Sequence, residues 1–355
     1  RTEGDMHRYN YTDCLSRVCK LANALVGLGI KKGDRVATLA WNGYRHLELY
    51  YGISGIGAVC HTINPRLSPE QMLYIIEHAG DRLLFVDTTF VPIIEKLIPK
   101  LPKNLVIIVM ASSDDSSTLS DNFLNYEQLI LESSHDIIWP ELPENTAAGL
   151  CYTSGTTGNP KGALYSHRST VLHALTTSLN LGPSLGDGMK VLPVVPLFHV
   201  NAWGLPYAAP LTGTSLIFPG PNLDGASLFD LMDQENVNSA WGVPTVWLGL
   251  LEEIRKQERV PSQFQNVVIG GSAAPKSMIE EFESLGITVC HAWGMTEMSP
   301  VGTQGFLPGS MKKALSQDEQ ISKKCYQGRR VFGVDLKIVD ENDNSLPHDG
   351  IASGE

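Results

Sequence analysis

The hydrophobic residues of the first 110 positions follow two different periods, which predicts helices and strands in alternation. Between 12 and 28, apolar residues recur every three or four positions, the spacing of a helix that buries one face. The runs at 35–41 and 82–87 are short and mostly apolar, which is typical of strands covered on both faces. Further helices are predicted at 44–56, 68–80 and 90–99, and further strands at 59–63 and 105–110. We therefore expect a largely parallel sheet with helices on both faces.

Capping residues indicate where several of these helices begin and end. Ser68 and Gln71 have the spacing of a capping box, and Pro69 lies at the first helical position. Thr12 is predicted to cap the first helix and Gly29 to end it.

A second series of short apolar runs follows residue 185 and predicts a second sheet. The runs lie at 191–195, 214–218, 238–241, 267–269 and 287–291, and helices fill the gaps. After Gly309 the pattern changes, and 334–344 predicts a hairpin in a small antiparallel subdomain. The predicted fold class is α/β, with two adjacent subdomains of mostly parallel sheets. Ligands of open α/β sheets bind at the carboxyl ends of strands, so we expect a site in the cleft between the two sheets.

Composition excludes several classes of partner. The chain has 355 residues, of which 43% are hydrophobic and 18% charged, and its net charge is -11. A negative chain without a basic cluster is a poor match for nucleic acid. No apolar run is long enough to predict a transmembrane helix, and no signal peptide is present. The six cysteines show no metal-binding spacing and are interpreted as reduced thiols, which predicts a cytoplasmic protein.

The densest group of chemically active residues lies at 152–169, YTSGTTGNPKGALYSHRS. It combines three glycines, four hydroxyl residues and one lysine: Gly155, Gly158, Gly162, Thr153, Ser154, Thr156, Thr157 and Lys161. Glycine allows the backbone to approach a ligand closely, while backbone N–H groups and hydroxyls donate to phosphate oxygens. An apolar run precedes this segment and helical spacing from Ser166 follows it. The predicted order of strand, glycine loop and helix is typical of a phosphate site.

Two other interpretations of this segment are a P-loop and a solvated turn. A P-loop is excluded because Pro160 precedes Lys161 and Gly162 follows it. The remaining alternative is a solvated turn, the commoner meaning of a short glycine-rich run.

Three later segments also carry candidate chemistry. They are 192–207 (LPVVPLFHVNAWGLPY), 270–275 (GGSAAP) and 291–297 (HAWGMTE). Taken alone, His199 would be a core histidine bonded to backbone. The second segment would be a tight strand-to-helix turn with Pro275 near the first helical position, and it lacks the second glycine of a nucleophile elbow. Glu297 would be a surface carboxylate.

Together, in this order, the four segments resemble the adenylate-forming superfamily, which contains acyl-CoA synthetases, luciferases and the adenylation domains of peptide synthetases. The segments PVVPLFHVNAW and GVPTVW are most similar to those of medium- and long-chain fatty-acid CoA ligases. The resemblance covers essentially the whole chain and implies a large N-terminal AMP-binding domain. It divides the chain into 30–185, then 1–29 with 186–308, then 309–355 as the start of a small antiparallel β-barrel subdomain. A mobile C-terminal domain with a catalytic lysine would follow Glu355, so we expect a fragment.

The resemblance also implies roles for individual residues. The phosphates would bind Ser154, Gly155, Thr156, Thr157, Gly158 and Lys161, with Thr296 at the α-phosphate. Adenosine would contact Gly271, Ser272, Ala273, Ala292, Trp293 and Gly294. The acyl group would contact Val200, Trp203, Gly204, Gly270 and Gly271; Val200 would also border the nucleotide and Trp203 would gate the acyl tunnel. Mg²⁺ would bind Thr153 and Glu297, and His199 would face the substrate carboxylate, so the catalytic residues would be Thr153, Thr296, Glu297 and His199.

The side chains at two of these positions have physical consequences for ligand binding. Trp293 stands where the family usually has tyrosine; an indole stacks on adenine equally well but lacks the phenolic hydroxyl. We expect Glu297 to be buried, because a buried carboxylate without a cation costs roughly several kcal/mol and this would favour a metal.

The activity implied is a two-step ligation that uses ATP, Mg²⁺, coenzyme A and a fatty acid. The fatty carboxylate would attack the α-phosphate of ATP to give acyl-adenylate and pyrophosphate, and the thiol of coenzyme A would then displace AMP. The protein would position the reactants and offset their charge. Two alternatives stay open: an adenylating enzyme for an aryl, amino or luciferin-type acid, and a fragment that binds ATP or acyl groups without turnover. A homodimer and peripheral contact with a membrane also stay open.

Overall fold

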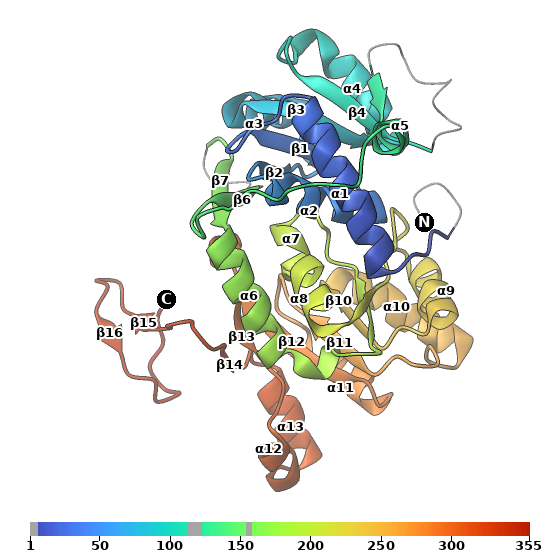
Figure 1. Ribbon diagram of the computed structural model, residues 1–355. Coiled ribbons are helices and arrows are strands. Elements are labelled where there is room, and N and C mark those ends of the chain that lie inside the picture. Colours follow the sequence, from blue (N-terminus) through green and yellow to red (C-terminus); the bar gives the residue numbers. More distant parts are fainter. Residues whose placement is uncertain (1–5, 113–122, 154–157) are drawn as a thin grey trace.

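The helices and strands of the computed structural model follow the predicted alternation (Figure 1). The structure describes residues 6–112, 123–153 and 158–355. In the first half the helices are α1 (Tyr11–Gly27), α2 (Tyr44–Gly55), α3 (Pro69–Ala79), α4 (Val91–Leu97) and α5 (Tyr126–Leu131). The strands there are β1 (Arg35–Leu39), β2 (Val59–Thr62), β3 (Asp81–Asp87), β4 (Val106–Met110), β5 (Phe123–Asn125), β6 (Ala147–Thr153) and β7 (Lys161–Ser166).

These strands form one seven-stranded sheet in the order β5-β4-β3-β1-β2-β6-β7. Neighbouring strands are parallel from β5 to β6, and β6 pairs with β7 in the antiparallel direction. The strands β1 and β3 are almost fully buried along their length, as expected for a sheet covered on both faces.

Most of the predicted helix boundaries are confirmed, but the first cap is wrong. Ser68 and Gln71 form the predicted capping box, and Gly80 ends the helix in the left-handed conformation. The helix α1 is capped by Asn10 rather than by Thr12, because the backbone of Asn10 is extended and its side chain accepts the N–H of Asp13 at 2.9 Å. Thr12 therefore lies inside the first turn, two residues after the cap.

The second half forms a second seven-stranded sheet in the order β14-β13-β12-β11-β10-β8-β9. Its strands are β8 (Lys190–Pro193), β9 (Ser215–Leu216), β10 (Ser239–Gly242), β11 (Asn266–Ile269), β12 (Thr288–Gly294), β13 (Val301–Gln304) and β14 (Arg329–Arg330). Its helices are α6 (His167–Asn180), α7 (Val200–Trp203), α8 (Leu205–Thr212), α9 (Gly225–Glu235), α10 (Pro244–Gln257) and α11 (Lys276–Ser284). The strands are parallel from β9 to β12 and antiparallel from β12 to β14. The α/β fold class is confirmed.

One hydrophobic core joins the two halves. It contains Val36 and Phe85 from the first sheet together with Trp241 and Val268 from the second. The helix α1 packs against α2 and α5, and the hydroxyl of Tyr11 donates to the carbonyl of Thr214 in the second half at 2.6 Å. The predicted division into subdomains stays a prediction, since these contacts tie residues before 30 to both halves.

The C-terminal residues form two short helices and a small hairpin. The hairpin pairs β15 (Ile338–Val339) with β16 (Ser345–Leu346) in the antiparallel direction, as predicted, and lies apart from the two sheets in Figure 1. The helices α12 (Gly309–Ala314) and α13 (Gln317–Lys324) were not predicted. The capping box of Ser316 and Glu319 was visible in the sequence and marks the start of α13. None of the helices in the described residues has the length and apolar character needed to cross a membrane.

Candidate active site

The glycine-rich segment connects β6 to β7, and its two flanks are paired. Ser154, Gly155, Thr156 and Thr157 lie outside the described residues. Thr153 at the end of β6 is the register partner of Lys161 at the start of β7; its hydroxyl donates to the Lys161 carbonyl at 3.4 Å. Gly158 has φ +103°, a conformation that favours glycine. The strands β6 and β7 on either side of the predicted phosphate segment thus form an antiparallel pair, called the phosphate hairpin below, with the exposed Lys161 at the start of β7.

The predicted order of strand, loop and helix is wrong in one respect. Residues 161–166 form β7 instead of leading directly into the helix, because they pair with β6 along its length. Ser166 caps α6 as expected, but this helix start lies a whole strand away from the loop, about 17 Å for six residues. The N-terminus of α6 therefore lies far from the base of the glycine loop.

A cleft brings residues of the other three segments together. It is lined by His199, Val200, Trp203, Gly270, Gly271, Ala292, Trp293, Gly294, Met295, Thr296, Pro300 and Val301. Nine of these twelve were predicted site residues, and the remaining three, Met295, Pro300 and Val301, lie in or directly after the HAWGMTE segment. Their position beside that segment was the signal that could have identified them.

Of the residues predicted to bind phosphate or Mg²⁺, the described Thr153, Gly158, Lys161 and Glu297 do not line this cleft, and three of those predicted for adenosine or the acyl group do not line it either. Ser272 and Ala273 are exposed in the turn that leads to α11. Gly204 belongs to the acyl segment and lies against the buried His173, where an added methyl group would come within 2.5 Å of the imidazole Nδ1. Gly204 is therefore a packing position, and a side chain there would displace His173.

The acyl segment enters the cleft through an unusual left-handed turn. Val200, Asn201, Ala202 and Trp203 have φ values of +48°, +52°, +45° and +57°. Left-handed backbone costs roughly 1–2 kcal/mol per residue for L-amino acids, so surrounding contacts must hold the turn. The hydroxyl of Tyr50 donates to the side-chain oxygen of Asn201 at 3.2 Å and to the carbonyl of Leu197 at 2.5 Å.

Trp203 ends this turn and is the more buried of the two tryptophans that line the cleft. It is 9% exposed, and its indole lies so close to Gly270 that an added methyl group there would be 3.0 Å from the ring. Gly271 has φ +78°. The two glycines thus let the backbone of one cleft wall approach the indole on the other.

His199 is exposed and lines the cleft, which excludes the reading of a core histidine. The surrounding protein partly desolvates the imidazole of His199, and nearby Arg66 adds positive charge. Both effects lower the pKa of His199. A neutral imidazole is therefore available at the cleft near neutral pH.

The HAWGMTE segment begins in β12 and ends in a short turn at Thr296–Met298. Trp293 is 38% exposed, and its indole packs across Gly302 on the neighbouring strand β13. One face of the ring is supported by protein, and the exposed part lies in the cleft. This arrangement suits stacking on a planar ligand.

Glu297 is exposed, so the expectation of a buried carboxylate is wrong, and with it the desolvation argument for a metal. The turn buries Thr296 and directs the next side chain outward. Among the described residues, no hydrogen bond or ion pair holds the carboxylate of Glu297. It is free to bind a cation.

The residues proposed for Mg²⁺ have suitable chemistry. Thr153 offers a hydroxyl oxygen and Glu297 a carboxylate oxygen, the hard ligands that Mg²⁺ prefers. Because Mg²⁺ keeps several waters and takes further ligands from phosphates, two protein ligands can suffice. The described residues contain no group of three or more His, Cys, Asp or Glu side chains placed to hold a metal, so a nucleotide would have to complete such a site.

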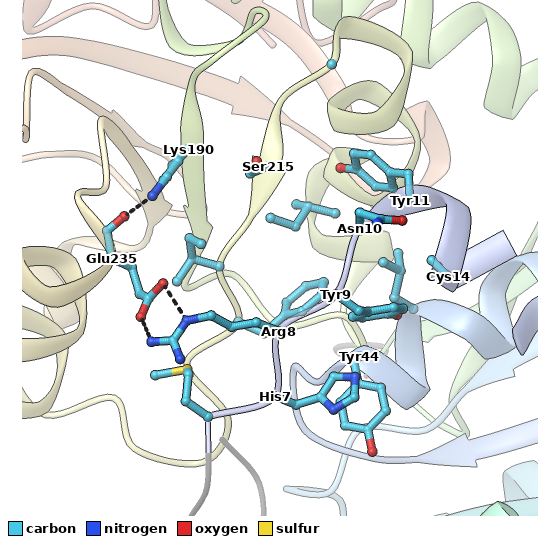
Figure 2. Close-up of a pocket in the computed structure, with 16 residues that line it drawn as sticks. His7, Arg8, Tyr9, Asn10, Tyr11, Cys14, Tyr44, Lys190, Ser215 and Glu235 are labelled. Carbon is cyan, nitrogen blue, oxygen red and sulfur yellow. Dashed lines mark hydrogen bonds and ion pairs between the residues drawn. The ribbon is translucent and has the colours of Figure 1, made fainter. Parts of the chain in front are cut away.

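A second cavity lies beside the N-terminal segment and contains none of the predicted site residues (Figure 2). His7 stacks on Tyr44 with ring centroids 3.8 Å apart, Arg8 pairs with Glu235, and Lys190 donates to the Glu235 carbonyl at 2.7 Å. Because these basic groups already have partners within the protein, this cavity is a weaker candidate for a polyphosphate than the cleft.

Comparisons with known proteins agree with the geometry of the cleft. The chain is 49% identical to a medium-chain-fatty-acid–CoA ligase of Ectopseudomonas oleovorans over 99% of this chain and 65% of that protein. It is 46% identical to a 3-methylmercaptopropionyl-CoA ligase of Ruegeria lacuscaerulensis over 100% of this chain and 66% of that protein. The chain therefore spans just under two thirds of the length of these curated relatives.

The fold has solved counterparts. The structure of the anthranilate CoA ligase AuaEII with anthranoyl-AMP superposes with a TM-score of 0.81 at 22% identity, covering 95% of this chain and 62% of that one. The family model described as AMP-binding enzyme matches residues 2–355. A match over nearly every residue, together with the cleft and the hairpin described above, establishes that the chain belongs to the family of AMP-binding enzymes.

Proposed function

We propose that this chain is the ATP- and acyl-binding part of a fatty-acid CoA ligase, which forms an acyl-adenylate and then acyl-CoA, AMP and pyrophosphate. The observation that carries the proposal is the single cleft in which Trp203 of the acyl segment, Gly271 of the glycine turn and Trp293 of the HAWGMTE segment meet. An acyl group on one wall and a nucleotide on the other would place the carboxylate next to the α-phosphate. The relative from Ectopseudomonas supports a medium-chain fatty acid as the substrate.

Each wall of the cleft has a role in this proposal. Trp293 would stack on adenine, with Gly271 allowing close approach of the backbone. Lys161 and the glycine loop would hold the polyphosphate, and Thr296 would contact the α-phosphate. His199 would face the substrate carboxylate. Reaction in line needs no protein nucleophile, since the carboxylate and later the thiol of coenzyme A supply the attacking atoms; the protein contributes positioning and charge.

Mg²⁺ is part of the proposal, with Thr153 and Glu297 as its protein ligands. When bound it would neutralise charge on the polyphosphate.

The lining of the cleft argues against an amino acid as the substrate. Among the described lining residues, only His199 carries a titratable side chain. An amino-acid substrate brings an ammonium group, whose burial is costly unless a carboxylate pairs with it. Trp203, Val200 and Val301 offer apolar contact instead. An aliphatic carboxylic acid is therefore the better match.

The cysteines bear on the compartment in which the protein works. Six free cysteines among the described residues fit a reducing compartment, and we include the cytoplasm in the proposal. The proposal includes neither a homodimer nor peripheral membrane contact, because nothing in the described residues supports either one.

Replacing Trp203 with alanine should change the preference for acyl chain length more than the affinity for ATP. The indole fills the acyl side of the cleft and is buried, so its loss enlarges that side by a ring. We expect kcat/KM for hexadecanoate to rise relative to that for octanoate, while the Kd of ATP stays close to the parent value. Trp139→Ala, which removes a half-buried indole outside the cleft, is the control. Equal losses for ATP and every acid would show that Trp203 only supports the fold.

ATP–pyrophosphate exchange tests the proposal as a whole. Exchange should be driven by decanoate and more weakly by benzoate or an amino acid. The same assay with 3-methylmercaptopropionate asks whether the chain shares the substrate of its relative from Ruegeria. Exchange with an amino acid but not with decanoate would reassign the substrate class. Binding of ATP without exchange for any acid would leave a binding fragment that lacks catalytic parts.

A further inference from the structure

The loop between β12 and β13 carries Thr296 and Glu297, and it is held at both ends by one neighbouring segment. Near its start, the hydroxyl of Tyr165 donates to the carbonyl of Thr296 at 2.6 Å. At its end, the N–H of Val301 donates to Nε2 of His173 at 3.1 Å. Tyr165 lies in β7 and His173 in α6, which follows it directly. One continuous stretch of chain therefore anchors both ends of the loop.

Tyr165 connects the two sides of the proposed nucleotide site. It is 4% exposed and belongs to the same strand as Lys161, which begins β7. Burial raises the pKa of Tyr165, with smaller contributions from Cys151 and from the negative charge of Glu297. The phenol thus stays protonated and acts as a donor, and Glu297 lies close enough to act on it.

His173 is suited to accept the hydrogen bond from Val301, and the hydroxyl of Thr177 lies 3.4–3.5 Å from its ring nitrogens. Burial lowers the pKa of His173 to about 4, so the imidazole is neutral and its Nε2 lone pair can accept the N–H of Val301. Its other side touches Gly204 so closely that an added methyl group would come within 2.5 Å of Nδ1. The ring is fixed between the acyl segment and the end of the loop.

We propose that Tyr165 and His173 are positioning residues that hold the Glu297 loop at a fixed distance from the phosphate hairpin. A nucleotide with Mg²⁺ must contact Lys161 and Thr153 on one side and Glu297 on the other, so the spacing of the two sides decides whether both can bind it. The inference rests on the proposed function, because it assigns these residues to the same nucleotide site.

The test measures how much Mg²⁺ improves the binding of ATP. Calorimetric titration gives the Kd of ATP with MgCl₂ and with EDTA for the parent chain, for Tyr165→Phe and for Tyr11→Phe. Both variants lose one phenolic hydroxyl that donates to a backbone carbonyl at 2.6 Å, but Tyr11 lies away from the cleft. We expect Tyr165→Phe to reduce the Mg²⁺-dependent gain about 3- to 10-fold, the usual range for one lost hydrogen bond, and Tyr11→Phe to leave it unchanged.

A double-mutant cycle with Glu297→Gln separates positioning from simple stability. If Tyr165 acts through Glu297, the double mutant Tyr165→Phe/Glu297→Gln should bind Mg·ATP nearly as tightly as Glu297→Gln alone. For His173, Gln keeps a side-chain acceptor and Leu does not. His173→Gln should therefore retain most of the gain that His173→Leu loses.

The outcomes are distinct. Losses that add in the double mutant, or equal Mg·ATP binding for Tyr165→Phe and Tyr11→Phe, would overturn the positioning role while leaving the proposed function standing. A parent chain whose ATP affinity does not respond to Mg²⁺ would instead contradict the proposed function, and the inference with it.

Discussion

Glu297→Gln should lower the rate of acyl-adenylate formation about 100- to 1,000-fold, the usual effect of losing one preorganised charge or donor at a transition state. The carboxylate is exposed directly after Thr296, which lines the cleft, and it has no hydrogen bond or ion pair among the described residues. Glutamine has nearly the same shape but no charge, and a neutral amide oxygen binds Mg²⁺ more weakly. Since the carboxylate supports no other residue there, the free energy of unfolding should stay unchanged.

The measurement is decanoate-dependent ATP–pyrophosphate exchange across a MgCl₂ titration, with urea unfolding alongside. Glu341→Gln is the matched control, because Glu341 is exposed in the turn of the C-terminal hairpin, away from the cleft. An unchanged rate at every Mg²⁺ concentration would remove Glu297 from the site. A large drop in stability would show that the residue has a structural role.

The second large effect is on stability. Arg17→Met should lower the free energy of unfolding by about 3–5 kcal/mol at pH 7, the usual cost of removing one partner from a buried ion pair. The Nε of Arg17 donates to Glu48 at 2.7 Å, and both terminal nitrogens donate to Glu127 at 2.9 Å. Arg45 also binds Glu127, so Glu127 keeps a cation. Glu48, whose side chain is fully buried, keeps only the hydroxyls of Tyr9 and Tyr126 among the residues that the structure describes.

The loss of stability in Arg17→Met should depend on pH. Burial raises the pKa of Glu48, and Arg17 opposes this rise; without Arg17 the carboxyl should take up a proton more readily. A folded-state pKa above the unfolded value means that the folded chain binds the extra proton, so the stability of the variant falls as pH rises. The deficit relative to the parent should therefore shrink between pH 7 and pH 5.

Arg255→Met provides the comparison for this prediction. Arg255 also binds a carboxylate at 2.8 Å, that of Glu281, but its side chain is 59% exposed. Exposed pairs contribute about 0–1 kcal/mol, so urea unfolding should show a small change. Similar losses in the two variants would mean that the buried network does not stabilise the fold in the way described.

The two sheets could be predicted because strands buried on both faces appear in the sequence as short apolar runs. Runs such as 35–41 and 267–269 are short, apolar and separated by helical spacing, and each became a central strand. The strand β7 was missed because the apolar positions of this region were interpreted as leading from the glycine loop directly into the helix. Its residues from Lys161 to Ser166 alternate little in polarity, and only one of them is buried, so they carry a weak strand signal.

The cleft could be predicted only as a set of segments. The resemblance to the adenylate-forming superfamily identified Trp203, Gly271 and Trp293, and all three line it. The left-handed turn at Val200–Trp203 has no sequence signal, since its four residues are not glycine and tertiary contacts impose the conformation. The exposure of Glu297 and the hydrogen bond from Tyr165 depend on how a loop packs against β7, which periodicity cannot show.

The central claim is that one cleft holds both the nucleotide and the acyl group. Calorimetric titration of the chain with 5′-O-(N-decanoylsulfamoyl)adenosine, a stable analogue of decanoyl-AMP, tests it most directly. The account predicts one site per chain, an affinity at least ~100-fold above that for AMP because the analogue joins both ligands, and displacement by ATP. An affinity no better than that of AMP, or simultaneous binding of AMP and the analogue, would contradict it.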